Sequence, residues 1–204
     1  MIKINNTLST LLIITFFTFI GSINSYAQVS FRPGIRSGAN FSHFTKGNDY
    51  YYDPSNPENS GNDYVEYTTK TEFYIGFYGA LKLSKYYTLQ PEIDYSAQGS
   101  NYEDDNNKTV NLNIDYLSIE VLNKFTFNNF NIHVGPTLDF VVDKNFRAET
   151  NFDMAFVLGM GFNFTPNFGI EARVKKGIIP VIDFYDTHTN VVFSLGGTYT
   201  FDIK

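Results

Sequence analysis

The sequence predicts an all-β fold, an eight-stranded antiparallel up-and-down transmembrane β-barrel, and two observations point to it. First, apolar and polar residues alternate through eight segments, most clearly from Tyr87 to Gly99. A period of two over such a length is typical of a β-strand with one apolar and one polar face. Second, the connections between these segments are alternately long and short, which is the pattern of barrels in the bacterial outer membrane.

The composition favours strands over long helices. The chain has 204 residues, of which 18% are aromatic, with 21 Phe and 15 Tyr. Aromatic residues are enriched in strands. The formal net charge is -6 and no run of Lys or Arg occurs, so we expect no nucleic-acid partner. The absence of Cys excludes disulfides, thiolate metal sites and a Cys nucleophile.

The first part of the chain is expected to be a cleaved signal peptide, residues 1–27, followed by one barrel domain, residues 28–204. An apolar run extends from Leu11 to Gly21, and Ser25-Tyr26-Ala27 then places small residues at the two positions that a signal peptidase reads. The alternative is an uncleaved anchor, for which the apolar run is short.

Each expected strand is a stretch of alternation that ends at turn-forming residues. Short turns are predicted at Ser84-Lys85, Asn128-Asn129 and Thr165-Pro166-Asn167, whereas the other connections are long and polar. A polar connection as long as residues 45–70 usually carries function or is disordered. The expected strands are residues 31–44, 72–83, 87–99, 110–125, 130–142, 154–164, 168–175 and 191–201.

Two irregularities are expected within the strands. Pro91 cannot donate a ladder hydrogen bond, which predicts a bulge or another local irregularity. In the fourth segment, the apolar residues up to Ile114 take even positions, whereas those from Leu117 onward take odd positions. This change of phase at Asp115-Tyr116 predicts one inserted residue in that strand, or a kink where the strand meets its loop.

The two faces of the strands differ in a way that predicts which one meets lipid. The apolar faces carry large side chains on nearly every strand, too many for the interior of an eight-stranded barrel. The other faces mix charges with small residues such as Gly38, Gly76 and Gly159, which can fill a narrow lumen. Aromatic residues beside the short turns, for example Tyr86 and Phe127, are typical of an interfacial girdle. The alternative is a soluble periplasmic barrel that binds an apolar ligand inside.

Three segments carry a resemblance to a known family. They are Gly34 to Ser42, Leu89 to Gly99, and Asp115 to Val121. The last is similar to a Tyr-Leu-Glu-Ile-Pro segment, from which Ser118 and Glu120 depart. Together they resemble the PorT-like outer-membrane β-barrel family of Bacteroidota. The resemblance implies an eight-stranded barrel, and some members of that family are linked to secretion or surface display.

Ionisable side chains on the polar faces are the main candidate site. A functional hypothesis is a path for protons or ions through the lumen. We favour a plug of mutually satisfied ion pairs, because charges in a narrow bore need partners and the two signs roughly balance. The predicted lumenal charge network consists of Arg36, Lys82, Glu92, Asp94, Glu120, Lys124, His133, Asp139, Glu171, Arg173 and Lys175.

The long loops offer three further candidates. A Tyr-rich loop could contact a partner, since Tyr suits interfaces, or could be a mobile surface loop. Glu103-Asp104-Asp105 could bind a divalent cation, but the spacing favours a solvated acidic loop. Asp183, Asp186 and His188 resemble the Asp and His residues of outer-membrane proteases, but no matching second pair is evident and eight strands form a small frame. The possible partner loop is marked by Tyr50, Tyr51, Tyr52, Tyr64 and Tyr67.

These observations predict a non-enzymatic outer-membrane protein with a filled lumen. We expect no catalytic residue, no cofactor and no bound metal. The expected partners are the lipid of the outer membrane and, through the long loops, an extracellular or envelope protein. Besides the soluble ligand-binding barrel, the remaining alternative is an outer-membrane enzyme that uses the loop Asp and His residues.

Overall fold

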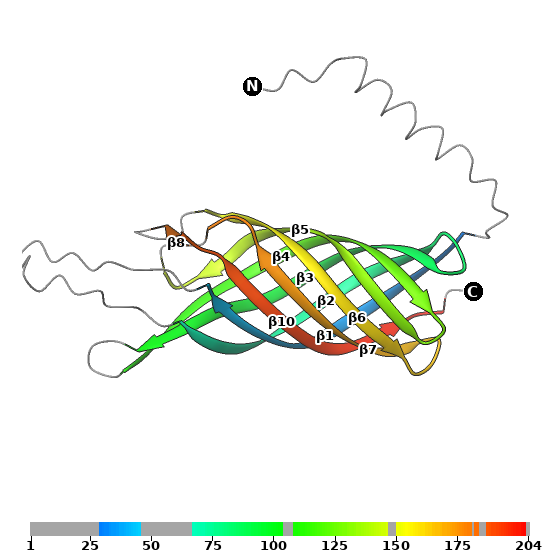
Figure 1. Ribbon diagram of the computed structural model, residues 1–204, viewed down its shortest axis with the longest axis horizontal. Coiled ribbons are helices and arrows are strands. Elements are labelled where there is room, and N and C mark those ends of the chain that lie inside the picture. Colours follow the sequence, from blue (N-terminus) through cyan, green and yellow to red (C-terminus); the bar gives the residue numbers. More distant parts are fainter. Residues whose placement is uncertain are drawn as a thin grey trace, which may run out of the picture.

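The computed structural model describes residues 29–45, 67–103, 108–146, 150–180, 182–183 and 187–202. The expected signal peptide lies outside these described residues. Eight strands form a closed barrel (Figure 1). They are β1 (Ser30–Phe44), β2 (Thr68–Lys82), β3 (Tyr87–Glu103), β4 (Thr109–Phe127), β5 (Phe130–Lys144), β6 (Phe152–Asn163), β7 (Phe168–Gly177) and β10 (Asn190–Thr200).

The topology is up-and-down. Each barrel strand pairs antiparallel with the next one along the chain, and β10 closes the barrel on β1, with pairs from Gly34 and Thr200 to Phe44 and Asn190. The strands are tilted against the long axis of the barrel (Figure 1), as closure of a barrel requires. The predicted fold class is confirmed. Among the described residues, no helix has the length and hydropathy of a membrane span.

The apolar faces of the strands point outward and the polar faces point inward. Ile93 is 55% exposed, whereas its neighbour Glu92 is 2% exposed. Leu158 on β6 is 58% exposed, and Ile132 on β5 is exposed as well. The large apolar side chains therefore cover the outside of the barrel. A soluble barrel with an apolar interior would need the opposite arrangement, so that alternative is wrong.

Aromatic side chains gather beside the short turns. Tyr86 stacks with Phe127 at a ring separation of 5.8 Å, and Phe164 stacks with Phe168 at 5.9 Å. The turn between β4 and β5 uses Asn128 at a φ of 55°, a left-handed conformation that Asn adopts more readily than most residues. Short turns and aromatic rim thus lie at the same end of the barrel.

The irregularity expected at Asp115-Tyr116 is present, but the inserted residue lies in the neighbouring strand. The register between β4 and β5 shifts there, because Asp115 pairs with Asp143 and Tyr116 pairs with Val141. Val142 of β5 is the additional residue. Alternation within β4 continues unbroken, so its even positions point inward along the whole strand. The prediction of an insertion in β4 was wrong, since the apolar residues before Asp115 face the lumen.

No bulge occurs at Pro91. The pairs on either side, Tyr78 with Glu92 and Leu81 with Leu89, keep one register, and Pro91 itself pairs with Val121 of β4. The ladder to β2 is interrupted over the two residues between those pairs. Because Pro91 has no N–H, the ladder between β2 and β3 is broken locally, but no extra residue is inserted and the register is kept.

A register shift that we did not predict lies between β2 and β3. It falls between Thr69 and Tyr74 of β2. On β3, Gly99 has a φ of 149°, which side-chain-bearing residues rarely adopt, and an added Cβ would lie 2.0 Å from the carbonyl oxygen of Leu112. Ser42 of β1 holds this segment, since its hydroxyl accepts from the Gly99 N–H at 2.9 Å.

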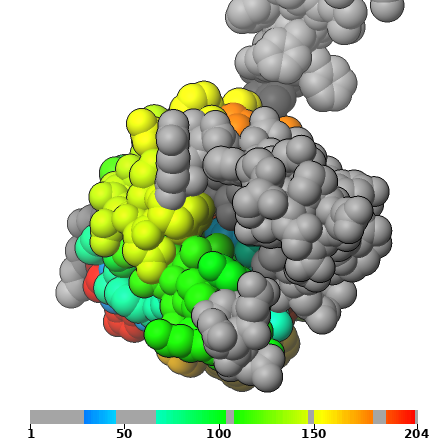
Figure 2. Space-filling view, turned by 90° about the vertical axis from the view of Figure 1, so that its left-hand side faces the viewer, coloured from blue at the N-terminus to red at the C-terminus, as the bar shows by residue number. Residues whose placement is uncertain are grey.

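The connection between β7 and β10 contains a small hairpin that the sequence did not predict. It consists of β8 (Ile182–Asp183) and β9 (Thr187–His188), which pair antiparallel. In Figure 1 β8 lies at the end of the barrel opposite the short turns. Figure 2 views this end, where residues of β3 and β4 (green) and of β5 (yellow-green) lie along one side of the barrel mouth.

The outward position of Leu158 near the middle of β6 leads to a prediction. Leu158→Arg should lower the free energy of unfolding in lipid by about 2–4 kcal/mol, because it places a charge in the hydrocarbon layer. Leu158→Ala, the control, should cost less, since it removes apolar area without adding charge. Urea unfolding in lipid vesicles measures both values. Equal stability of Leu158→Arg and the unchanged protein would contradict a lipid-facing position.

Candidate functional site

Closure of the barrel brings the inward side chains of all strands together in one lumen. Most of the predicted network lies there. Lys124 is half-buried, and Lys82 points into the barrel at the short-turn end, where it is exposed. The other nine residues are buried: Arg36, Glu92, Asp94, Glu120, His133, Asp139, Glu171, Arg173 and Lys175.

Arg173 on β7 is the centre of the ion pairs. Its Nη1 donates to Glu92 at 2.7 Å and to Glu120 at 3.0 Å. Its Nη2 donates to the other oxygen of Glu92 at 2.9 Å and to Glu171 at 3.0 Å. One guanidinium therefore joins β7, β3 and β4 across the lumen through charge-assisted bonds.

Arg36 on β1 extends this cluster to a fourth strand. Its Nε donates to Glu171 at 2.7 Å, and its Nη1 donates to Asp94. The guanidinium also lies 4.2 Å from the ring centroid of Tyr74, close enough for a cation–π contact. Glu171 thus accepts from Arg36 and Arg173 together, so the two arginines form one network.

A second ion pair lies one inward position further along β7. Lys175 donates to Asp139 of β5 at 2.8 Å, and Asp139 also accepts from the Thr137 hydroxyl at 2.9 Å. The Lys175 ammonium lies 6.0 Å from the ring centroid of Tyr116. The charged filling therefore occupies two successive levels of the lumen.

We expected the cations and carboxylates of the lumenal network to pair in roughly equal numbers, and the structure shows a different pairing. Lys82 and Lys124 take part in no ion pair within the described ranges. The reason is their depth, since both lie nearer to the short turns than the carboxylates do. The buried pairs then join three cations to five carboxylates: Arg36, Arg173 and Lys175 with Glu92, Asp94, Glu120, Asp139 and Glu171.

Three of these carboxylates could by geometry hold a metal ion. Oxygen atoms of Glu92, Asp94 and Glu120 all lie within 4.8 Å of one another. Carboxylate oxygens are the ligands of Ca²⁺ and Mg²⁺. The guanidinium groups of Arg36 and Arg173 already donate to the three residues, however, and supply positive charge at that point. We therefore interpret the cluster as part of the ion-pair network.

His133 of β5 lies beside the network and bonds to a neighbour on its own strand. Its Nδ1 is 3.1 Å from the side-chain oxygen of Asn131. Gly159, its partner on β6, leaves room for the imidazole, because an added Cβ would lie 2.2 Å from Nε2. Gly76 does the same for Asp94, with a hypothetical Cβ 1.5 Å from a carboxylate oxygen. Small lumenal residues thus make space for the charged ones.

An apolar layer that sequence reasoning missed fills the lumen toward the long loops. Its buried members are Phe44, Ile114 and Tyr116, and Leu112 and Val141 pack against them. A signal was available, because Leu112 and Ile114 share the even positions of Tyr116 and of the charged Glu120 on the same strand. The lumen is therefore occupied by charged groups in its middle and by apolar groups at this end.

The loop candidates are only partly described. Tyr67 packs at the barrel end, with its ring centroid 5.5 Å from that of Phe44 and 5.1 Å from that of His188. His188 Nδ1 donates to the carbonyl oxygen of Thr45 at 2.6 Å. Glu103 is exposed. Outside the described residues lie Tyr50, Tyr51, Tyr52, Tyr64, Asp104, Asp105, Asp186 and the side chain of Asp183.

An up-and-down barrel with an apolar exterior, an aromatic rim and a charged, filled interior is a transmembrane β-barrel of the outer-membrane class. The sequence agrees with this class. Residues 26–183 match the model of the family described as "Outer membrane protein beta-barrel domain", and the chain belongs to that family. No curated protein matches it by sequence.

Solved outer-membrane barrels are similar in fold. Neisserial surface protein A is 11% identical with a TM-score of 0.52, and the match covers 83% of this chain and 97% of that protein's chain. OprG from Pseudomonas aeruginosa is 12% identical with a TM-score of 0.50, and the match covers 86% of this chain and 98% of the OprG chain. Ail from Yersinia pestis, in complex with a heparin analogue, is 15% identical with a TM-score of 0.49, and the match covers 84% of this chain and 99% of the Ail chain. At these identities the likeness concerns the fold alone.

The role of Arg173 leads to a prediction about stability. Arg173→Gln should lower the free energy of unfolding by about 3–5 kcal/mol, because it leaves buried carboxylates without their counter-ion. Arg32→Gln is the control, since Arg32 pairs with the exposed Asp202 and its loss should cost about 1 kcal/mol or less. Urea unfolding in lipid measures both. A cost for Arg173→Gln as small as that of the control would contradict its central position.

The filled lumen also predicts how the protein behaves in planar bilayers. We expect no steady, large openings, because charged and apolar layers occupy the bore at successive levels. A 16-stranded porin in the same bilayers serves as the positive control, since barrels of that size leave an aqueous channel. Steady, large openings of this protein would contradict the interpretation of the network as a plug.

Proposed function

We propose that this protein is a non-enzymatic outer-membrane component that acts through its long loops, in surface interaction or in support of envelope assembly and secretion. The observation that carries the proposal is the filling of the lumen by the Arg36–Arg173 network and by the apolar layer around Phe44. With the bore occupied, the surfaces that remain for a partner are the two ends of the barrel. Loops are where binding residues are found most often.

The proposal places the long loops outside the cell, since barrels of this class carry short turns on the periplasmic side. It includes export through a cleaved signal peptide, residues 1–27, and a place in the PorT-like group of Bacteroidota. The resemblance of the segments Gly34 to Ser42 and Leu89 to Gly99 supports that group. A partner would be an extracellular or envelope protein, and the outer surface would contact membrane lipid.

Deletion of the segment from Asp49 to Asn62 tests the loop proposal. The shortened protein should still insert and show heat-modifiable gel mobility, because the segment lies between β1 and β2 and outside both strands. It should fail to capture the partner that the intact protein isolates from native envelopes.

The matched control changes another long connection, with Asp104 and Asp105 replaced by Ser. This variant should capture the partner as the unchanged protein does. If the Asp49–Asn62 deletion also leaves capture unchanged, the proposal that this loop binds the partner is wrong.

A further inference from the structure

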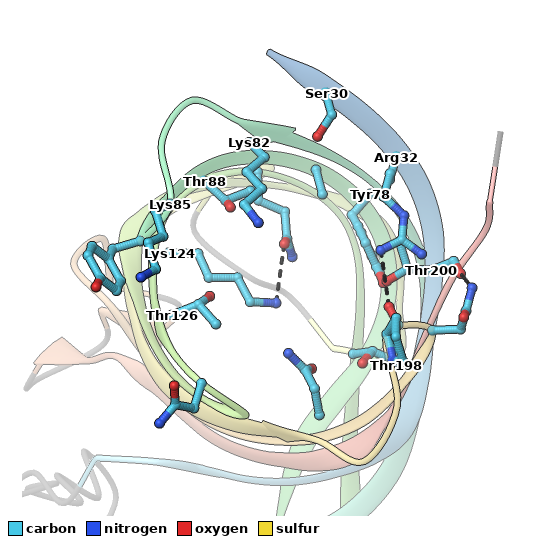
Figure 3. A pocket seen from close by; sticks show the side chains of 17 residues that line it. Ser30, Arg32, Tyr78, Lys82, Lys85, Thr88, Lys124, Thr126, Thr198 and Thr200 are labelled. Carbon is cyan, nitrogen blue, oxygen red and sulfur yellow. Dashed lines mark hydrogen bonds between the residues drawn. The ribbon is translucent and has the colours of Figure 1, made fainter. Parts of the chain in front are cut away.

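A polar cavity of about 390 Å³ opens at the short-turn end of the barrel, and we call it the basic vestibule. Residues of three short turns line it, including Lys85, Asn128 and Pro166, together with inward residues of the adjoining strands (Figure 3). Its deep end is Gln90, whose amide donates to Glu92 of the network at 2.6 Å. The vestibule therefore lies at the opposite end from the long loops.

The charge of the basic vestibule is of one sign. Four lining residues are cationic, and of the described residues that line it none is Asp or Glu. Figure 3 shows all four cationic side chains around the cavity. They are Arg32, Lys82, Lys85 and Lys124.

Only one of the four cations has an acidic partner in the part of the chain that the structure describes. Arg32 pairs with Asp202 at 2.6 Å and also donates to the carbonyl oxygen of Pro166 at 3.1 Å. Lys85 lies 5.1 Å from the ring centroid of Tyr86. The other two lysines, and Lys85 itself, form no ion pair there.

Lys124 lies deepest in the basic vestibule of these lysines, and its surroundings show most clearly that a counter-ion is missing among the described residues. It is half-buried, and its ammonium donates to the side-chain oxygen of Gln90 at 3.4 Å. Gln90 in turn donates to Glu92, so a neutral amide lies between the lysine and this carboxylate of the network. A half-buried cation without a counter-ion is costly unless an anion meets it.

We propose that the basic vestibule binds a small anion that carries two or more phosphate groups. Lys82, Lys85 and Lys124 supply three positive charges that form no ion pair within the described residues, and one carboxylate would leave most of that charge unmatched. Lysine binds phosphate as a point charge. The hydroxyls of Thr88 and Thr126, which also line the cavity, can donate to phosphate oxygens.

Two sources of such an anion share this chemistry. One is a soluble periplasmic compound with two or more phosphates, and the other is the headgroup of cardiolipin, a phospholipid with two phosphates, from the facing leaflet. Both would enter from the short-turn end. The site does not depend on the proposed role of the long loops, and its failure would leave that role standing.

Titration calorimetry with inorganic pyrophosphate tests the proposal on the full chain in a zwitterionic detergent. Pyrophosphate should bind, and binding should weaken as salt is added, because exposed charges are screened. Lys82→Gln with Lys85→Gln should weaken binding by about tenfold or more, since two cations are lost from one site. Both residues lie at the exposed rim, so the variant should keep heat-modifiable mobility.

The matched control removes two lysines from the other end of the barrel. Lys144→Gln with Lys176→Gln lowers the net charge by the same amount but leaves the vestibule intact, and binding should be unchanged. Lys124→Gln adds a single-site comparison and should weaken binding as well. Absence of pyrophosphate binding, or equal losses in the rim variant and the control, would overturn the proposal.

Nanodiscs separate the two sources. Pyrophosphate should bind in discs of phosphatidylcholine alone. If added cardiolipin competes with it, and does so only while Lys82 and Lys85 are present, the anion is a lipid headgroup. If cardiolipin has no effect, the anion is soluble. Both results support the site, whereas absence of binding in phosphatidylcholine discs contradicts it.

Discussion

The structure depends on the pairing of buried charges across a narrow lumen. An eight-stranded barrel leaves little more than the space of its own side chains, so an inward arginine must meet its partners from other strands. Glu171 accepts from both Arg36 and Arg173, and through these bonds β1, β3, β4 and β7 meet at one point. Because removing one member would leave the others buried and unmatched, the network acts as a unit.

The rest of the lumen is arranged around this network in layers. Toward the long loops, Lys175 and Asp139 form a second charged level, and the apolar layer around Phe44 and Ile114 follows. Toward the short turns, the filling stops at Gln90, and the basic vestibule begins. The two ends thus differ in chemistry, with an apolar closure on one side and an open cationic cavity on the other.

Much of the fold could be predicted from alternation, since a strand exposes successive residues to opposite faces. Ile93 and Glu92 were assigned to the correct faces in this way. Alternation continued from Glu120 places Leu112 and Ile114 inward, but the rule that apolar residues face lipid assigned them to the outside, because an apolar residue suits a lipid-facing position and a packed lumen equally well. Their neighbours in space, Phe44 and Val141, come from other strands, and no local pattern contains that information.

The sequence by itself determined the all-β barrel architecture and the outward direction of the bulky apolar side chains, because these follow from a period of two along each strand and from the alternation of long and short connections. Only the tertiary structure decided which charges meet. Lys124 and Arg173 look equivalent in sequence, but the tilt and register of the strands set their depths. Arg173 therefore lies among carboxylates, whereas Lys124 lies in a cavity whose described lining contains none.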